Sequence, residues 1–269
     1  MILLLICLTA TLSAIPSEAS NTQIYVDGCL PGTKQASSLH CLSQENIKLR
    51  EEAKLLRKQL GAISCRCDDL GPSGGFCLDV EHPSKGGNDY MDNDLVKELH
   101  SLYDGHSVLD LGCGLGQYGE ALRLLGIDWT GYDGAEHVEE ATKGLVQFMD
   151  LSKPHWLGKQ YDWVMSLEVG EHLPSEVTST FVGNLLRHAK CGLVLSWALP
   201  GQGGHHHVNE LSNADVISMI EEGSELRFDR GKTAMLRAHA SVAWFKNTLM
   251  VFDGHGKNCM HHGLNVAPI

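Results

Sequence analysis

The stretch that decides the fold is Val108-Leu109-Asp110-Leu111-Gly112-Cys113-Gly114-Leu115-Gly116. Its first four residues predict a short buried strand, and a helix is expected to follow from residue 117. The loop between them carries glycine at every second position, which permits positive φ angles and lets a ligand approach the backbone closely. Such a loop can serve a dinucleotide, but its G-x-G-x-G spacing differs from the G-x-G-x-x-G fingerprint of dinucleotide-binding domains.

Short apolar runs alternate with helical stretches after residue 107. We expect strands at 108–111, 129–132, 145–149, 163–167, 192–197, 226–229 and 248–252. Helices are expected at 92–103, 117–125, 138–143, 176–189 and 212–222, with one more before the last strand. This alternation predicts an α/β, Rossmann-like fold, a doubly wound parallel sheet with helices on both faces. Ligands of such sheets bind at the carboxyl ends of the strands.

Acidic residues stand at these strand ends. Asp110 lies two residues before the first glycine, and Asp133 ends the next strand, where it can accept hydrogen bonds from ribose hydroxyls. Asp150 ends the third strand and could meet an adenine amino group. The fourth strand leads to Glu168. The four acids are therefore expected around one ligand at one edge of the sheet.

Four segments, VLDLGCGLGQYGEAL, GYDGA, FMD and YDWVMSLEVGEHLP, resemble class I S-adenosylmethionine-dependent methyltransferases, and the resemblance covers roughly residues 90 to 255. It implies a seven-stranded sheet with a reversed final hairpin, and S-adenosylmethionine as cofactor. An inactive methyltransferase fold is the alternative. The cofactor-binding residues that the resemblance implies are Asp110, Gly112, Cys113, Gly114, Gly116, Tyr132, Asp133, Asp150, Leu151 and Glu168.

Three candidate catalytic residues, Glu168, Glu171 and His172, follow the fourth strand and should face the methyl group. A base helps when the acceptor is a hydroxyl or a protonated amine. His172 is the first candidate for that base, because an unperturbed imidazole titrates near about 6.5. The alternative is that Glu171 and His172 only support the loop.

The segment 196–209 follows the fifth strand and should border the acceptor pocket. Its Ser-Trp-Ala, Pro-Gly-Gln-Gly and His-Val-Asn elements are similar to a loop in a subset of type-11-like methyltransferase domains. Trp197 could form a wall of the pocket, while Gln202, His207 and Asn209 could bind a polar acceptor. Three consecutive histidines, 205–207, also suggest a metal, but neighbouring side chains point in different directions, so we expect no metal site. A polar surface loop is the other alternative.

The N-terminus is typical of a targeting signal. Residues 1–15 are almost wholly apolar, Pro16 follows, and Ser17 and Ala19 form a small-x-small cleavage pattern. We expect a signal peptide at 1–19 and a location in the secretory-pathway lumen or outside the cell, with an uncleaved anchor or a buried helix as alternatives. Nine cysteines are present, and Cys29, Cys41, Cys65, Cys67 and Cys77 cluster together, which favours disulfides over a zinc site.

A heptad pattern fills residues 42–63 within the N-terminal segment 20–67. Leu42, Leu49, Leu56 and Ile63 take d positions, and Asn46, Ala53 and Leu60 take a positions. The pattern predicts a homo-oligomer through a coiled coil, or alternatively one amphipathic helix lying on the main domain. A Gly-rich loop, 68–91, follows as a lid or a plain linker, and residues 92–269 form the methyltransferase-like domain.

The charge balance limits the partners. The chain has 21 Lys and Arg against 33 Asp and Glu, a net charge of −12, so nucleic acid is not expected. No apolar run reaches 18 residues, so a stable membrane span is not expected either. The expected function is methyl transfer to a small molecule, glycan or protein in the secretory pathway. The alternatives are an inactive binding or oligomerising protein, favoured by the cytosolic origin of the methyl donor, and a metal-dependent enzyme.

Overall fold

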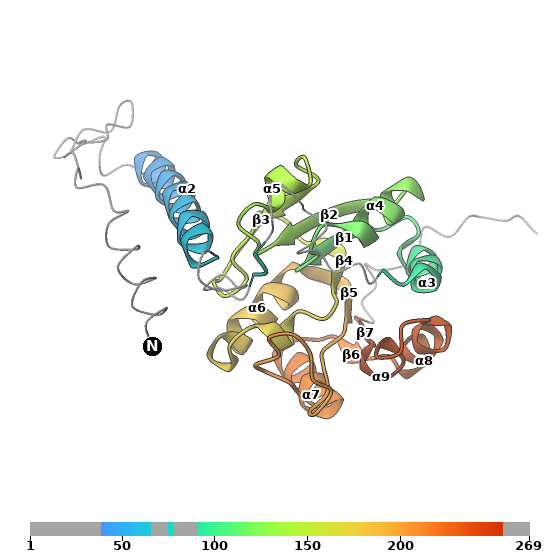
Figure 1. Ribbon diagram of the computed structural model, residues 1–269. Coiled ribbons are helices and arrows are strands. Elements are labelled where there is room, and N and C mark those ends of the chain that lie inside the picture. The colour runs from blue at the N-terminus through green and yellow to red at the C-terminus, as the bar shows by residue number, and fades with distance from the viewer. Residues whose placement is uncertain (1–38, 66–74, 78–90, 255–269) are drawn as a thin grey trace, which may run out of the picture.

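The computed structural model describes residues 39–65, 75–77 and 91–254, with side chains from residue 44 onward (Figure 1). Within them a single sheet has seven strands in the order β3-β2-β1-β4-β5-β7-β6. Strands β1 to β5 are parallel, and β7 runs antiparallel to both β5 and β6. The predicted seven-stranded sheet with a reversed final hairpin is therefore confirmed. Its strands are β1 (Ser107–Leu111), β2 (Asp128–Asp133), β3 (Val146–Phe148), β4 (Tyr161–Ser166), β5 (Ala189–Leu195), β6 (Arg227–Phe228) and β7 (Met250–Asp253).

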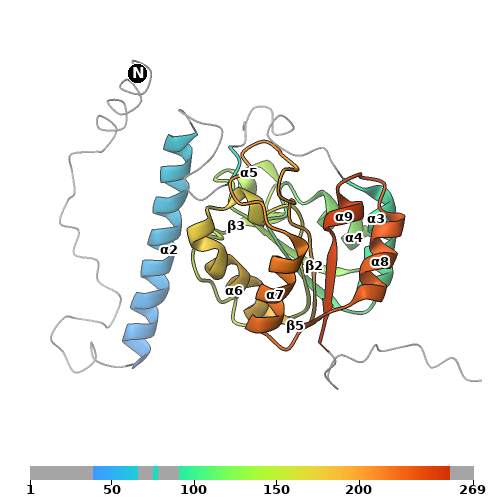
Figure 2. The same ribbon diagram turned by 90° about the horizontal axis from the view of Figure 1, so that it is seen from below.

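Helices cover both faces of the sheet. Figure 2 shows α3, α8 and α9 on one side and α6 and α7 on the other. The predicted helix 176–189 begins as a 3-10 turn, Ser175–Val177, and becomes α-helical only at Thr178. The helices are α3 (Asn93–Tyr103), α4 (Gln117–Leu124), α5 (Val138–Ala141), α6 (Thr178–His188), α7 (Asn213–Gly223), α8 (Arg230–His239) and α9 (Phe245–Thr248).

The core lies on both faces of the central strands. Leu109 and Leu111 of β1 pack with Phe181 of α6, whereas Val108 of the same strand packs with Leu95 of α3. Alternate residues of a strand point to opposite faces, so a strand buried on both faces reads as a continuous apolar run. This packing fixes the carboxyl ends of β1, β2 and β4 along one edge of the sheet.

Helix α2 (Leu39–Ser64) stands beside α5 and the edge strand β3 (Figure 1). Lys54 and Lys58 place their Nζ atoms 3.0 and 2.8 Å from the two carboxylate oxygens of Glu139 on α5. The apolar side chains of Leu49 and Leu56 are 58% and 64% exposed. The predicted helix is confirmed, but its charged face, not its apolar stripe, lies on the domain.

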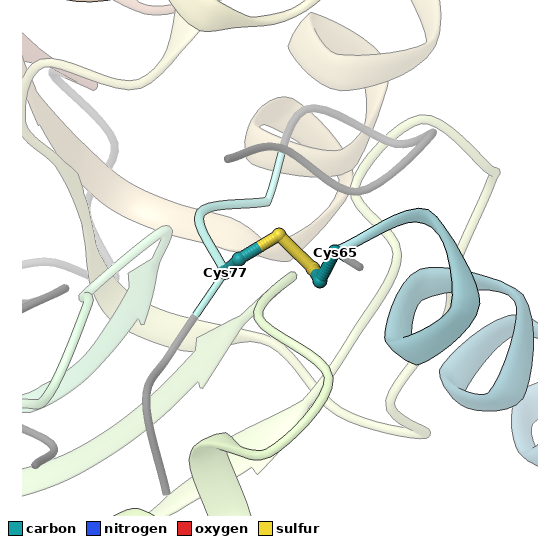
Figure 3. The surroundings of a disulfide bond; sticks show 2 residues. All are labelled: Cys65 and Cys77. Atoms are coloured by element: carbon teal, nitrogen blue, oxygen red, sulfur yellow. A yellow bond between two sulfur atoms is a disulfide. The ribbon is translucent and has the colours of Figure 1, made fainter. Parts of the chain in front are cut away.

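A disulfide joins Cys65, just after α2, to Cys77, with a Cα–Cα distance of 5.5 Å (Figure 3). Cys191 on β5 is disulfide-bonded as well, and Cys113 of the glycine loop is free. The predicted use of cysteines for disulfides is thus confirmed. The expected signal at 1–19 and most of the Gly-rich segment 68–91 lie outside the described residues. Among the residues that are described, no helix is long and apolar enough to cross a membrane.

Candidate functional site

The glycine loop after β1 has the backbone that the sequence predicts. Gly112, Gly114 and Gly116 adopt φ angles of +84°, +57° and +79°, a region that side chains disfavour. A Cβ on Gly112 would lie 2.4 Å from Cγ2 of Val169, so glycine is also required sterically. The N–H groups of Gly112 and Cys113 donate to the carbonyl oxygen of Tyr132, at 2.8 and 3.2 Å. Tyr132 therefore supports the loop through its backbone.

Asp133, at the end of β2, faces this loop. Its carboxylate accepts hydrogen bonds from the N–H of Gly114 at 2.8 Å and of Ala135 at 2.9 Å. Burial raises the pKa of this carboxyl, and the backbone N–H groups oppose that rise. Each carboxylate oxygen has a second lone pair, so both remain able to accept from a diol. The end of β2 thus presents carboxylate oxygens that can accept further hydrogen bonds.

Asp110 lies deeper, with 2% of its surface exposed. Its Oδ2 accepts a hydrogen bond of 3.2 Å from the indole Nε1 of Trp129. Burial raises the pKa of this carboxyl to about 8, and the charge of Asp133 adds to the rise. A ligand ammonium group at this position would favour the ionised carboxylate.

Asp150 is held differently from the other strand-end acids. Its Oδ1 accepts from the N–H and the Oγ of Ser152, at 3.0 and 2.5 Å, and its Oδ2 lies 3.5 Å from Nε of Arg57 on α2. Its neighbour Leu151 lines the cavity described next. Of the two residues expected to frame the adenine, Leu151 therefore lines the cavity, while the carboxylate of Asp150 links the domain to α2.

One cavity of about 730 Å³ joins the glycine loop to the segment after β4. Phe76, beside the Cys65–Cys77 disulfide, closes part of it, with its ring centroid 5.0 Å from that of His172. The sequence did not identify Phe76 as a site residue. Its place within segment 68–91, the expected lid, was the one indication that it could lie at the cavity. The predicted residues that line the cavity are Asp110, Gly112, Cys113, Gly114, Asp133, Leu151, Glu168, His172, Gln202 and His207.

Beyond the glycine loop, Glu168 and Glu171 stand together with few partners. Glu168 lies two residues after the end of β4 and has a φ of +54°, an uncommon angle for a residue with a side chain. Its carboxylate meets the Oγ1 of Thr248 at 3.3 Å and the Nε2 of Gln202 at 3.4 Å. Glu171 is fully buried, and neither of its carboxylate oxygens forms a hydrogen bond of normal geometry among the described residues; its polar neighbours are the backbone of Ala198 and the carboxylate of Glu168. Burial and the charge of Glu168 raise the pKa of Glu171 to about 9.

His172 and His207 complete this end of the cavity, with their ring centroids 4.9 Å apart. Burial and the nearby His207 lower the pKa of His172 to about 4, so His172 is neutral at pH 7. Its Nδ1 is buried without a hydrogen-bond partner. His207 instead places its Nδ1 3.1 Å from Oε1 of Glu210, whose carboxylate also accepts the N–H of Gly201 at 2.7 Å.

Two residues expected to bind the acceptor are structural instead. Trp197 is fully buried, and its indole Nε1 donates to the carbonyl oxygen of Asn209 at 2.7 Å. Asn209 donates in turn to Oγ1 of Thr178 at 2.9 Å. The two therefore anchor the ends of the loop after β5. The sequence prediction treated the whole loop as facing the cavity, whereas of the four residues proposed there only Gln202 and His207 line it.

The sheet order, the reversed β7 and the glycine loop together define the class I S-adenosylmethionine-dependent methyltransferase fold. Among solved structures, the sugar N-methyltransferase KedS8 from Streptoalloteichus sp ATCC 53650 matches 65% of this chain and 93% of its own, at 14% identity and a TM-score of 0.53. The CcbJ methyltransferase from Streptomyces caelestis matches 68% of this chain and 98% of its own length, at 12% identity and a TM-score of 0.51. No family model matches the chain, and no curated protein is significantly similar to it. The likeness is one of fold, and the resemblance of the 196–209 loop to one subset stays a prediction.

Proposed function

We propose that this chain is an S-adenosylmethionine-dependent methyltransferase that acts on a polar acceptor in the secretory pathway. The observation that carries the proposal is the pairing of the glycine loop with Asp133 at the mouth of one cavity. Gly114 donates to Asp133 across the carboxyl ends of β1 and β2, which is where nucleotide ligands of this sheet type bind. The fold alone would fit other ligands, so the residues of the loop decide the assignment.

In the proposed reaction a lone pair of the acceptor attacks the methyl carbon in line with the C–S bond. The C–S electron pair passes to sulfur, the sulfonium becomes the neutral thioether of S-adenosylhomocysteine, and the acceptor proton leaves to a base. Because the leaving group is good, much of the rate comes from proximity and orientation. Asp133 would hold the ribose, Asp110 the ammonium group, and Glu168 and His172 would face the acceptor, with the buried Glu171 behind them.

Calorimetric titration with S-adenosylmethionine and S-adenosylhomocysteine tests the cofactor assignment. We expect micromolar binding, about −8 kcal/mol, by the folded chain. Asp133→Ala would remove the two charge-assisted hydrogen bonds expected between this carboxylate and the ribose hydroxyls. Each is worth about 1.5–3 kcal/mol, so the affinity for the cofactor should fall at least about tenfold. Asp128→Ala, at the exposed start of the same strand, is the matched control and should bind as the wild type does. No binding by a folded wild-type chain would favour the inactive scaffold.

The secretory location is supported by the chemistry of the cysteines. Stable disulfides persist in oxidising compartments and are rare in the cytosol. Cys65 and Cys77 are bonded, and the bond ties α2 to the segment that carries Phe76. Expression in a eukaryotic host, followed by N-terminal sequencing of protein from the medium, tests this location. A chain beginning at Ser20 supports it, whereas a chain retained in the cytosol contradicts it.

We also propose that α2 pairs with α2 of a second copy as a parallel coiled coil. Lys54, Lys58 and Cys65 take the b and f positions and contact the domain, which leaves the a and d stripe facing away from it. Glu45 and Glu52 take g positions, and Arg50 and Arg57 take e positions. In a parallel, in-register pair, each g residue faces the e residue five positions later on its partner. Glu45 would then meet Arg50 across the pair, whereas Arg57 already lies beside Asp150 of the domain.

Light scattering with and without reductant tests the coiled coil. The wild type should have twice the mass of one chain, and joint replacement of Leu49 and Leu56 by Asp should give monomers. Leu55→Asp is the matched control, because Leu55 is 56% exposed but lies outside the stripe. A monomeric wild type, or an unchanged mass in the double variant, contradicts the proposal.

A further inference from the structure

Three side chains at the acceptor end of the cavity converge on one point. Glu171 and His172 come from the 3-10 turn η2 (Gly170–His172), and His207 comes from the loop between β5 and α7. Each offers one ligand atom, and the three atoms all lie within 4.8 Å of one another. The cluster joins segments 35 residues apart in the sequence, so the tertiary fold assembles it.

Three polar atoms of this cluster lack hydrogen-bond partners. Both carboxylate oxygens of Glu171 and Nδ1 of His172 are buried without a hydrogen bond. Buried polar groups are nearly always satisfied, so such a group indicates a missing ligand or water. Within the part of the chain that the structure describes, neither Glu168 nor Glu171 forms an ion pair with a lysine or arginine. The buried carboxyl of Glu171 and the half-buried carboxyl of Glu168 therefore stand without a cation.

His207 has the support that a metal-binding histidine usually has. A ligating imidazole commonly gives its other ring nitrogen to a carboxylate, which fixes its orientation and tautomer. Here Nδ1 of His207 lies 3.1 Å from Oε1 of Glu210, while the N–H groups of Gly201 and Gly203 hold that carboxylate, each at 2.7 Å. The imidazole ring of His207 lies against Gly204, and a Cβ added to Gly204 would be 2.2 Å from Nε2 of His207. The loop is thus shaped around this ring.

We propose that Glu171, His172 and His207 bind a divalent transition-metal ion, with Glu168 as the adjoining carboxylate. Two imidazoles and a carboxylate suit Zn²⁺, Co²⁺, Fe²⁺ or Mn²⁺. Ligand atoms about 2.0–2.2 Å from one ion lie roughly 3.3 Å apart in a tetrahedral site, so the side chains must close slightly around it. His172 and His207 line the cavity, so the open side of the ion would face the acceptor.

The proposal uses one histidine of the 205–207 run. The ring of His205 stacks on Phe76 at 6.1 Å, and His206 has a φ of +56°. Their side chains diverge, as adjacent side chains do, so the run does not chelate an ion by itself. The expectation of no metal site rested on this divergence within the run. With an ion bound, His172 is a ligand rather than a free base.

Titration of the full chain with Co²⁺, without a histidine tag, tests the proposal. The wild type should bind one equivalent, give the visible absorption of four- or five-coordinate Co²⁺, and lose it when Zn²⁺ is added. His207→Ala should abolish this signal, and His205→Ala, the matched control, should keep it. Glu210→Gln should weaken binding about 10- to 100-fold, as loss of a supporting carboxylate does.

Two outcomes would overturn the metal site. One is a folded wild type with less than one equivalent of Co²⁺ bound; the other is equal weakening by His205→Ala and His207→Ala. Thermal unfolding of each variant shows whether it is folded, and Glu171→Gln provides a second variant should His207→Ala misfold. The titration uses no cofactor, so its outcome is independent of whether the chain binds S-adenosylmethionine.

Discussion

The two ends of the cavity differ in how their polar groups are satisfied. At the glycine loop the protein supplies the partners itself: Asp133 accepts two backbone N–H groups, and Asp110 accepts the indole of Trp129. At the opposite end, the carboxylate of Glu171 and Nδ1 of His172 are buried without hydrogen bonds. The first end is already ordered for its ligand. The second carries groups that an ion or acceptor from outside would satisfy.

This difference reflects how each end is built. The glycine loop is continuous in the sequence, since it connects β1 directly to α4 and its three glycines adopt the required angles. The acceptor end combines η2 with a loop that follows β5, and Val208 and Asn209 donate their N–H groups to the carbonyl oxygen of Glu171 at 2.9 and 3.0 Å. We therefore expect mutations at the two ends to separate cofactor affinity from turnover.

The largest effect is expected at the acceptor end. His172→Ala should lower kcat by about 10²- to 10⁴-fold, the usual contribution of a group that moves or activates a proton. Affinity for S-adenosylmethionine should stay within a factor of about two, because the ribose and ammonium positions lie on other strands. Single-turnover kinetics and calorimetry measure the two quantities. An equal loss in both would give His172 a structural role.

A smaller effect is expected at the glycine loop. Gly112→Ala places a Cβ against Val169 in a strained backbone and should weaken cofactor binding at least about tenfold, or 1.4 kcal/mol. Gly126→Ala is the matched control, because Gly126 has a φ of +92° with no atom within 4 Å of the added Cβ. Both variants should lose about 1–2 kcal/mol of stability from backbone strain. Unchanged cofactor affinity in Gly112→Ala would contradict the role of the loop.

The contrast between local and long-range contacts also explains which features the sequence predicted and which it did not. The strands, the glycine loop and Asp133 follow local rules of periodicity and spacing, and the structure has them where they were expected. The places of Trp197 and Asn209 depend on how the loop after β5 folds back onto η2, which no local pattern encodes. The lack of hydrogen-bond partners for the Glu171 carboxylate was equally unpredictable, because it depends on which side chains, distant in the sequence, pack around it. The charged contact face of α2 depends on α5, far away in the sequence.

The smallest effect concerns Asp110 and pH. Its carboxyl, with a pKa of about 8 in the free chain, is mostly protonated at pH 7, whereas the cofactor ammonium favours the carboxylate. Binding then releases a proton, so affinity should rise with pH below 8, by about two- to tenfold from pH 6 to 7. Asp110→Asn cannot ionise and should lose this dependence, which leaves only the contributions of other groups. Calorimetry in buffers of different ionisation enthalpy counts the released proton directly. Equal pH slopes in the wild type and the variant would mean that Asp110 does not change its ionisation when the cofactor binds, which would contradict this prediction.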